Sequence, residues 1–169
     1  MLVFALSACT SRTSATHDAD PELAAYVALM MPQKIEIQHF LSKPVSYARN
    51  GTADGVEAIL AAEDALGDRT KPVGTFHFEL YTVPFASGSR LGQRIAFWTV
   101  KIDSESAVRE YWDRLTRFYQ FPLKLDAAAL APGRYRLAAR LLTPGGDTLF
   151  DEYEFDHAAG AAANPSAGP

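Results

Sequence analysis

Cysteine is almost missing from this 169-residue sequence, which has one, at position 9. The chain after it therefore holds no disulfide and no thiolate metal site. Long hydrophobic runs are missing as well, and none reaches the roughly 18 residues that cross a bilayer as a helix. The sequence thus predicts no membrane-spanning helix.

The sequence also has no large excess of positive or negative charge. Lys and Arg number 16 against 20 Asp and Glu, a net charge of -4, which does not favour nucleic-acid binding. The metalloprotease pattern HExxH, the hydrolase pattern GxSxG and a phosphate-binding loop are missing from the sequence. We therefore expect a protein that is not an enzyme and uses no cofactor.

What is present begins at the single cysteine. Residues 1–8 are apolar and end in small side chains. The segment Leu6-Ser7-Ala8-Cys9 resembles the lipobox of bacterial lipoproteins. The resemblance implies that residues 1–8 are a signal peptide, removed in the mature protein, and that Cys9 is lipidated. The alternative is a chance match. No Lys or Arg precedes Cys9, so we expect the leader to start upstream of the sequence given.

The segments around the domain are poor in apolar residues. Residues 9–20 carry the cysteine and a small, polar stretch, which predicts a flexible tether. Residues 158–169 predict a disordered tail. Thr10, rather than an aspartate, follows Cys9, and the lipoprotein resemblance then implies a cell-envelope protein on the outer membrane, facing the periplasm.

Between these segments, residues 21–157 predict one folded domain. Asp20-Pro21-Glu22 is typical of a helix start, and apolar residues at helical spacing predict a docking helix that ends near Met31. A second helix is expected near 104–116, with Trp112 and Leu115 on its apolar face. Alternating apolar residues predict strands near 35–41, 56–62, 76–81, 93–102, 119–125, 135–141 and 149–155.

Two of these strands have special features. Residues 93–102 are apolar on both sides, which predicts a central strand covered on both faces. Pro122 has no backbone N–H, which places its strand at a sheet edge.

The last two strands can be set in register. A three-residue loop containing glycine would pair Thr143 with Asp147, and Arg136 with Glu154 on the outer face. Asp151 then lies opposite Ala139 on the inner face, and we expect a local bulge to turn it outward. Together the strands predict an all-β, antiparallel β-sandwich of seven to eight strands, similar to transthyretin-like or C2-like domains.

Candidate site residues each have a plain structural alternative. Asp64 and Asp68, with Glu63 and Gly67, form an acidic loop that could bind calcium, joined by Asp103 and Asp147 if they share one end of the domain. The alternative is a turn in which Asp bonds its own backbone.

Two histidines fall in predicted strands. His39 shares a face with Ile35 and Ile37, which favours a core or edge histidine. His77 is expected on an outer face with Glu79, where the pair offers too few ligands for a metal site.

Aromatic residues are close together in the second half of the sequence. They would form either an exposed binding platform or the core of the sandwich, and the arginines around them would form a solvated face. The residues concerned are Phe97, Trp98, Trp112, Phe118, Tyr119 and Phe121, with Arg90, Arg94, Arg109, Arg114 and Arg117.

Taken together, these features predict a membrane-anchored envelope lipoprotein whose sandwich binds another protein or the cell wall. Its layout is similar to that of the outer-membrane lipoprotein of type VI secretion systems, and a secretion-system component is one alternative. A calcium- or lipid-binding C2-like module is the second, and an unrecognised hydrolase is the third.

Overall fold

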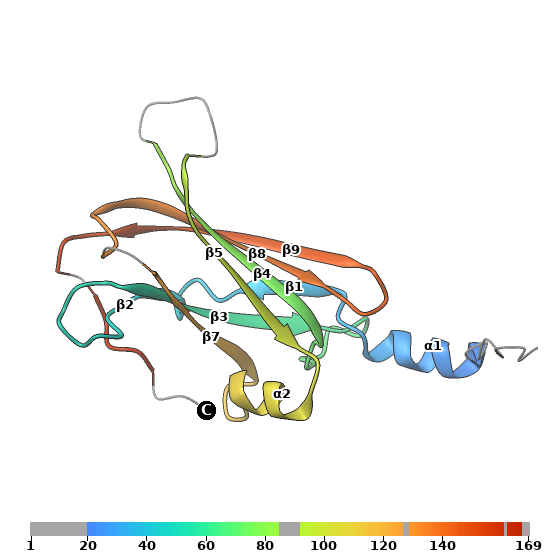
Figure 1. Ribbon diagram of the computed structural model, residues 1–169. Helices are drawn as coiled ribbons and strands as arrows, with labels where there is room; N and C mark the ends of the chain where they lie inside the picture. Colours follow the sequence, from blue (N-terminus) through green and yellow to red (C-terminus); the bar gives the residue numbers. More distant parts are fainter. Residues whose placement is uncertain (1–19, 85–91, 127–128, 161, 167–169) are drawn as a thin grey trace, which may run out of the picture.

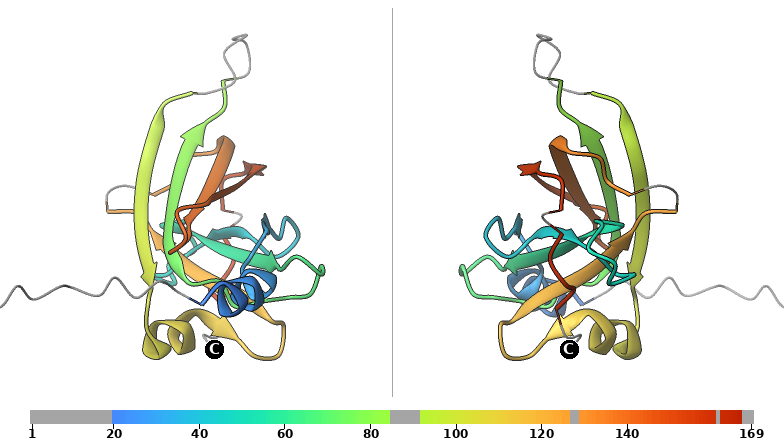
Figure 2. Two further views of the ribbon diagram at one scale, coloured as in Figure 1. Left: turned by 90° about the vertical axis from the view of Figure 1, so that its right-hand side faces the viewer. Right: turned by 90° about the vertical axis from the view of Figure 1, so that its left-hand side faces the viewer.

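The computed structural model describes residues 20–84, 92–126, 129–160 and 162–166. Strands make up 47% and helices 12% of the residues described, and the strands form two antiparallel sheets of five and four strands. The views of Figure 2, which look roughly along the strands, show the sheets as two layers. The predicted all-β sandwich is therefore confirmed.

The five-stranded sheet, called sheet A here, has the order β1-β3-β7-β6, and β2 also pairs with β3. Its strands are β1 (Lys34–Ile37), β2 (Lys43–Val45), β3 (Gly55–Glu63), β6 (Trp112–Asp113) and β7 (Phe118–Lys124). The four-stranded sheet, called sheet B, has the order β5-β4-β8-β9. Its strands are β4 (Gly74–Thr82), β5 (Arg94–Ile102), β8 (Gly133–Leu142) and β9 (Thr148–His157). Each predicted strand is present, and β2 and β6 are short additions.

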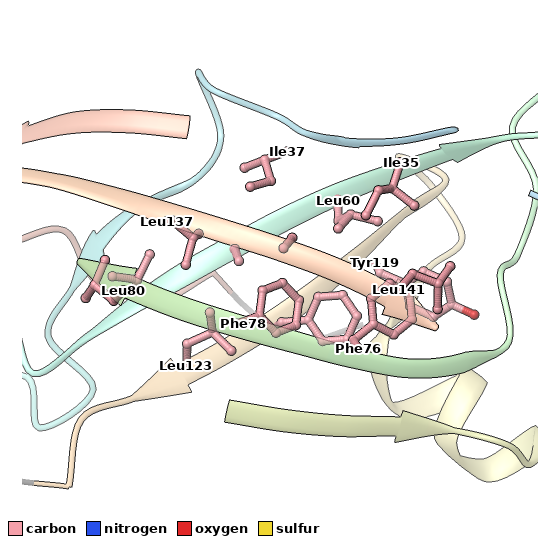
Figure 3. Close-up of a cluster of buried hydrophobic side chains, with 14 of the residues drawn as sticks. Ile35, Ile37, Leu60, Phe76, Phe78, Leu80, Tyr119, Leu123, Leu137 and Leu141 are labelled. Carbon is pink, nitrogen blue, oxygen red and sulfur yellow. The ribbon is translucent and has the colours of Figure 1, made fainter. Parts of the chain in front are cut away.

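The core lies between the sheets and is rich in aromatic rings (Figure 3). The ring of Phe121 on β7 lies 4.8 Å from that of Phe78 and 5.0 Å from that of Phe76, both on β4. Such tilted pairs add stabilisation beyond the burial of their apolar surface. Alternation along β4 and β7 thus places one side of each strand in this core.

The predicted hairpin register of β8 and β9 is confirmed. Thr143 N donates to Asp147 O over 2.9 Å, and Gly146 takes a φ of +91° in the loop. Arg136 pairs with Glu154 as expected. The predicted bulge at Asp151 is wrong, because the register runs past it unbroken. Asp151 Oδ2 instead accepts the N–H of Ile37 over 2.7 Å, so this carboxylate joins β9 of sheet B to β1 of sheet A.

The prediction of a central position for residues 93–102 is wrong. β5 is an edge strand of sheet B, and its outward-facing Ile95 and Phe97 are exposed. The strand covered on both faces is β3, in which each residue from Gly55 to Ala62 is buried. Alternation shows which residues are apolar, but it does not show which neighbours cover them.

The edge prediction from Pro122 holds for one part of its strand, because β6 and not β7 is the outermost strand of sheet A. On the side of β7 away from β3, the two-residue strand β6 pairs with Phe118 and Tyr119 only. Pro122 lies beyond that pairing, opposite Glu57 of β3. A residue without an N–H is tolerated there because no further strand of the described chain needs that donor.

Helix α1 (Pro21–Met30) has the predicted start, with Asp20 Oδ1 accepting the N–H of Glu22. The prediction that it docks on the domain is wrong. None of its residues is buried, and it projects from one end of the sandwich (Figure 1).

Helix α2 (Glu105–Tyr111) is shorter than the predicted 104–116. Trp112 enters β6 and is buried, whereas Leu115 is 91% exposed instead of lying on an apolar helix face. Asp113 explains the early end: its carboxylate accepts from Leu115 N and Thr116 Oγ1, which stabilises a turn.

Two further predictions need correction. β1 ends at Ile37 because Gln38 starts a turn, accepting from Leu41 N and Ser42 N, so the strand does not reach residue 41. The prediction of a disordered tail is wrong for residues 162–166, since Ala163 forms a β-bridge with Val45 of β2. Ser166 also donates from N and Oγ to the carboxylate of Glu57, over 2.9 and 2.7 Å.

Candidate functional site

The outer face of sheet B carries exposed aromatic side chains at both edges. Phe97 on β5 is 50% exposed, and Phe150 on β9 is 54% exposed. Because β4 and β8 lie between these strands, the two rings stand on opposite sides of the sheet face. Exposed aromatic side chains on either side of a sheet face are typical of an interaction site.

A shallow hollow of about 220 Å³ lies between the two rings. The strand register explains it: Glu79 of β4 pairs with Phe97 on one side and with Ala138 of β8 on the other. Ala138 is a small residue among larger outward-facing ones. It therefore leaves a depression that is lined by Phe97, Phe150, His77, Glu79 and Arg140.

Hydrogen bonds hold the polar groups on the β5 side of this hollow. His77 Nδ1 lies 3.1 Å from Thr99 Oγ1, and the imidazole stacks on the Phe97 ring at a centroid distance of 5.6 Å. Arg94 Nη1 donates to Glu79 over 2.6 Å, and its guanidinium lies over the Phe97 ring. These contacts fix the rings and charges before any ligand binds.

Burial alone would raise the pKa of Glu79, but hydrogen bonds from Arg94 and Tyr81 and the charges of Arg94 and Arg140 lower it. Glu79 therefore stays ionised, with Arg94 as its hydrogen-bonded ion-pair partner and Arg140 as a more distant positive charge.

Arg140 differs from the other charged residues of the hollow. It lies between His77 of β4 and Phe150 of β9 in the register. Within the described part of the chain it makes no hydrogen bond or ion pair. The hollow thus offers two aromatic walls and one available guanidinium, which suits an apolar group next to a carboxylate.

The predicted acidic loop forms the turn alternative. Asp64 Oδ1 accepts from Leu66 N and Asp68 N, over 2.9 and 3.0 Å, and Gly67 has a φ of +82°. Asp103 pairs with Lys101, and Asp147 lies in the β8–β9 turn. Among the residues that the structure describes, no three His, Cys, Asp or Glu side chains group as metal ligands.

The two histidines are not brought together. His39 lies in the turn after β1, not on a core-facing strand, and its exposed ring stacks on Tyr153 of β9 at 4.5 Å. His77 lies on the outer face of sheet B with Glu79, as predicted.

Of the six aromatic residues noted in the sequence, some lie in the core of the sandwich and others on its outer surface. Trp112, Tyr119 and Phe121 are buried in the core. Trp98 packs against it and donates from Nε1 to Lys124 O over 2.6 Å. Phe97 alone of the six points outward into the hollow, while Phe118 lies on the outer side of β7 below the guanidinium of Arg69.

Sequence reasoning did not single out Phe150, Ala138 or Arg140. A signal for Phe150 was present, because the correct hairpin register already places it on the outer face of β9. Cys9 and Arg90 lie outside the described residues.

Comparisons with family models, with curated proteins and with solved structures give no significant match. None of the helices in the described ranges is long and apolar enough to cross a membrane.

Proposed function

We propose that this protein is a lipid-anchored lipoprotein of the cell envelope, on the outer membrane and facing the periplasm, whose sandwich is a non-catalytic module that binds a protein partner. The observation that carries the binding role is the hollow between Phe97 and Phe150 with the available guanidinium of Arg140. The anchor is supported by the lipobox-like Leu6-Ser7-Ala8-Cys9, which holds the single cysteine.

The chemistry of the hollow narrows the kind of partner. Phe97 and Phe150 supply apolar contact area with few rotatable bonds, and Arg140 supplies a charged donor for a carboxylate. A protein segment that carries an acidic side chain beside an aliphatic or aromatic one fits these groups. Exposed aromatic and arginine side chains dominate the energetics of many protein interfaces.

The anchor is tested by labelling cells with an alkyne fatty acid and fractionating them. We expect the wild-type chain to be labelled and to sediment with membranes, and Cys9→Ser to lose the label and become soluble. Unlabelled wild-type protein, or label that survives the substitution, would contradict the anchor.

The binding face is tested by photo-crosslinking in cells, with a benzophenone amino acid placed at Phe97, Phe150 or Phe40. Phe40 is the matched control, because it is an exposed phenylalanine over sheet A, away from the hollow. We expect one adduct, identified by mass spectrometry, from positions 97 and 150 and not from 40, and its loss in Arg140→Glu. Equal adducts from all three positions would overturn the proposal.

A further inference from the structure

Helix α1 exposes large apolar side chains along its whole length. Leu23, Tyr26, Val27, Leu29 and Met30 are between 46% and 67% exposed. Its one charged residue, Glu22, already accepts a hydrogen bond from Tyr26 Oη over 3.2 Å. A helix this apolar is normally covered by another surface.

Among the residues that the structure describes, the contacts that hold α1 lie at its C-terminal end. Thr70 Oγ1 donates to Met30 O over 3.2 Å, and Pro32 is buried directly after the helix. The rest of α1 extends beyond the sandwich (Figure 1). In the described part of the chain, no segment buries its apolar surface, which can therefore contact something outside the domain.

Basic side chains surround the base of α1. One hollow is lined by Met30, Arg69, Lys71, Arg114 and Arg117, together with Thr70 and Trp112, and by no carboxylate. Arg69 is paired with Glu63. Within the described chain, no carboxylate lies within ion-pair distance of Lys71, Arg114 or Arg117. The positive charge is confined to this hollow, because Glu105 and Asp113 line the adjoining hollow together with Lys71 and Arg114. Asp64 and Asp68 also precede Lys71 in its loop.

Two of these cations are oriented by the fold. Lys71 Nζ lies over the Trp112 ring at 5.4 Å, and Arg117 Nη2 donates to Arg69 O over 3.0 Å. Leu115, which is almost fully exposed, follows Arg114. Apolar side chains and cations therefore share one end of the molecule.

We propose that this end docks on an anionic lipid bilayer, with α1 lying in the interface and Lys71, Arg114 and Arg117 next to lipid phosphates. Interfacial helices usually carry their own basic residues, and here the loops after β3 and α2 supply them. Each cation near an anionic membrane surface strengthens binding roughly fivefold.

The number of residues between Cys9 and α1 fits this docking, which here rests on the lipidation of Cys9 proposed above. Ten residues separate Cys9 from Asp20, and a fully extended chain spans at most about 3.6 Å per residue. A lipidated Cys9 would therefore keep α1 within about 40 Å of the bilayer. Docking of α1 would then fix the orientation of the sandwich on the membrane.

The test uses the full chain with Cys9→Ser, which has no acyl chain, in sedimentation with vesicles. The vesicles are phosphatidylcholine with about 30% phosphatidylglycerol, an anionic lipid that attracts cations. We expect the protein to bind these vesicles and not to bind vesicles of phosphatidylcholine alone. Lys71→Glu with Arg114→Glu should weaken binding at least about tenfold. Lys124→Glu with Arg134→Glu makes the same change in net charge at the other end of the sandwich, since Lys124 pairs with Gly55 at the start of β3 and Arg134 lies beside the end of β4, and it should retain binding.

Insertion of α1 is read separately. Cys9→Ser leaves no cysteine, so a Leu23→Cys variant can carry an environment-sensitive dye. Thr52→Cys is the control, because Thr52 is exposed and lies before the start of β3, at the other end of the sandwich. We expect the dye at position 23 to brighten on anionic vesicles and the dye at 52 to stay unchanged. Equal binding to both lipid mixtures, no binding, or an equal loss in the control variant would overturn the proposal.

A second copy of the chain is the competing cover for α1. Light scattering would then show a dimer, and Leu23→Gln with Val27→Gln would disrupt it. If the protein also did not bind vesicles, a second copy rather than a membrane would be the surface that covers α1. The protein in these experiments has no acyl chain. A negative result would therefore say nothing against lipidation of Cys9, which the fatty-acid labelling experiment tests separately.

Discussion

β3 and β5 are both nine residues long and have apolar side chains on both faces, but their surroundings differ. On the outer face of sheet A, Ile59 of β3 is 4% exposed, whereas on the outer face of sheet B, Ile95 of β5 is 40% exposed. β3 has paired strands on both sides and is overlaid by the C-terminal segment. β5 has a paired strand on one side only.

The difference shows that apolar residues on the outer face of a strand have two meanings. On β3 they are part of the packed structure, because Ile59 is buried and Glu57 on the same face accepts hydrogen bonds from Ser166 of the C-terminal segment. On β5 they remain in contact with water, which costs free energy unless a partner covers them. The uncovered strand is accordingly the one that contributes to the candidate binding surface.

The strongest test of this comparison replaces the same residue type on both strands. Ile59→Asn should lower the free energy of unfolding by about 3 kcal/mol, because it removes packing and buries an amide without partners. Ile95→Asn should change it by less than about 0.5 kcal/mol. Urea unfolding followed by tryptophan fluorescence measures both, and equal losses would show that β5 is covered as well.

The next largest effect concerns the link between the two sheets. Asp151→Ala removes the acceptor for the N–H of Ile37 and should cost about 2 kcal/mol. Asp151→Asn keeps an oxygen acceptor and should cost about half as much. Faster hydrogen exchange at the amide of Ile37 in the alanine variant would identify the cause, and unchanged exchange would contradict it.

The buried side of β3 gives a pH-dependent test through its cross-strand neighbour Tyr119. Burial raises the pKa of Tyr119 from 10.0 to about 12, so the folded state keeps the proton longer than the unfolded state. The stability that this contributes is present below pH 10 and is lost as the pH rises from 10 to 12.

Tyr119→Phe should therefore reduce the slope of stability against pH in this window by up to about 1.4 kcal/mol per pH unit. Urea unfolding at several alkaline pH values measures the slope. An unchanged slope would mean that the Tyr119 hydroxyl is accessible to water.

The smallest effect concerns the segment that covers β3. Ser166→Ala removes the hydroxyl that donates to Glu57 and should cost about 1 kcal/mol. Glu57→Gln is the matched change in the other partner. The double variant should lose less free energy of unfolding than the two single variants lose together. Exact additivity would show that the segment does not contact Glu57.

Much of the local structure could be predicted because it depends on neighbours in sequence. Asp20 and Pro21 start α1, alternation marks the strands, and the loop after Thr143 sets the β8–β9 register. Where prediction failed, distant contacts act together with local turns. β1 ends at the Gln38 turn, and Asp151 also stabilises that end. α2 ends before the Asp113 turn, where Trp112 can pair with Tyr119.

The candidate site was predictable only in part. His77, Glu79 and Phe97 were all noticed, and the register placed Phe150 on the outer face. The hollow itself required the order β5-β4-β8-β9, since only that order sets Ala138 between the two phenylalanines.

Local sequence patterns were sufficient for the fold class, seven of the nine strands, the hairpin register and the start of α1, because periodicity, capping and turn chemistry act over a few residues. The tertiary structure decided which doubly apolar strand is covered, that Asp151 links the sheets, that residues 162–166 pack on β2 and β3, and that α1 extends away from the domain. Each of these depends on which distant segments lie side by side, and local patterns in a chain do not contain that information.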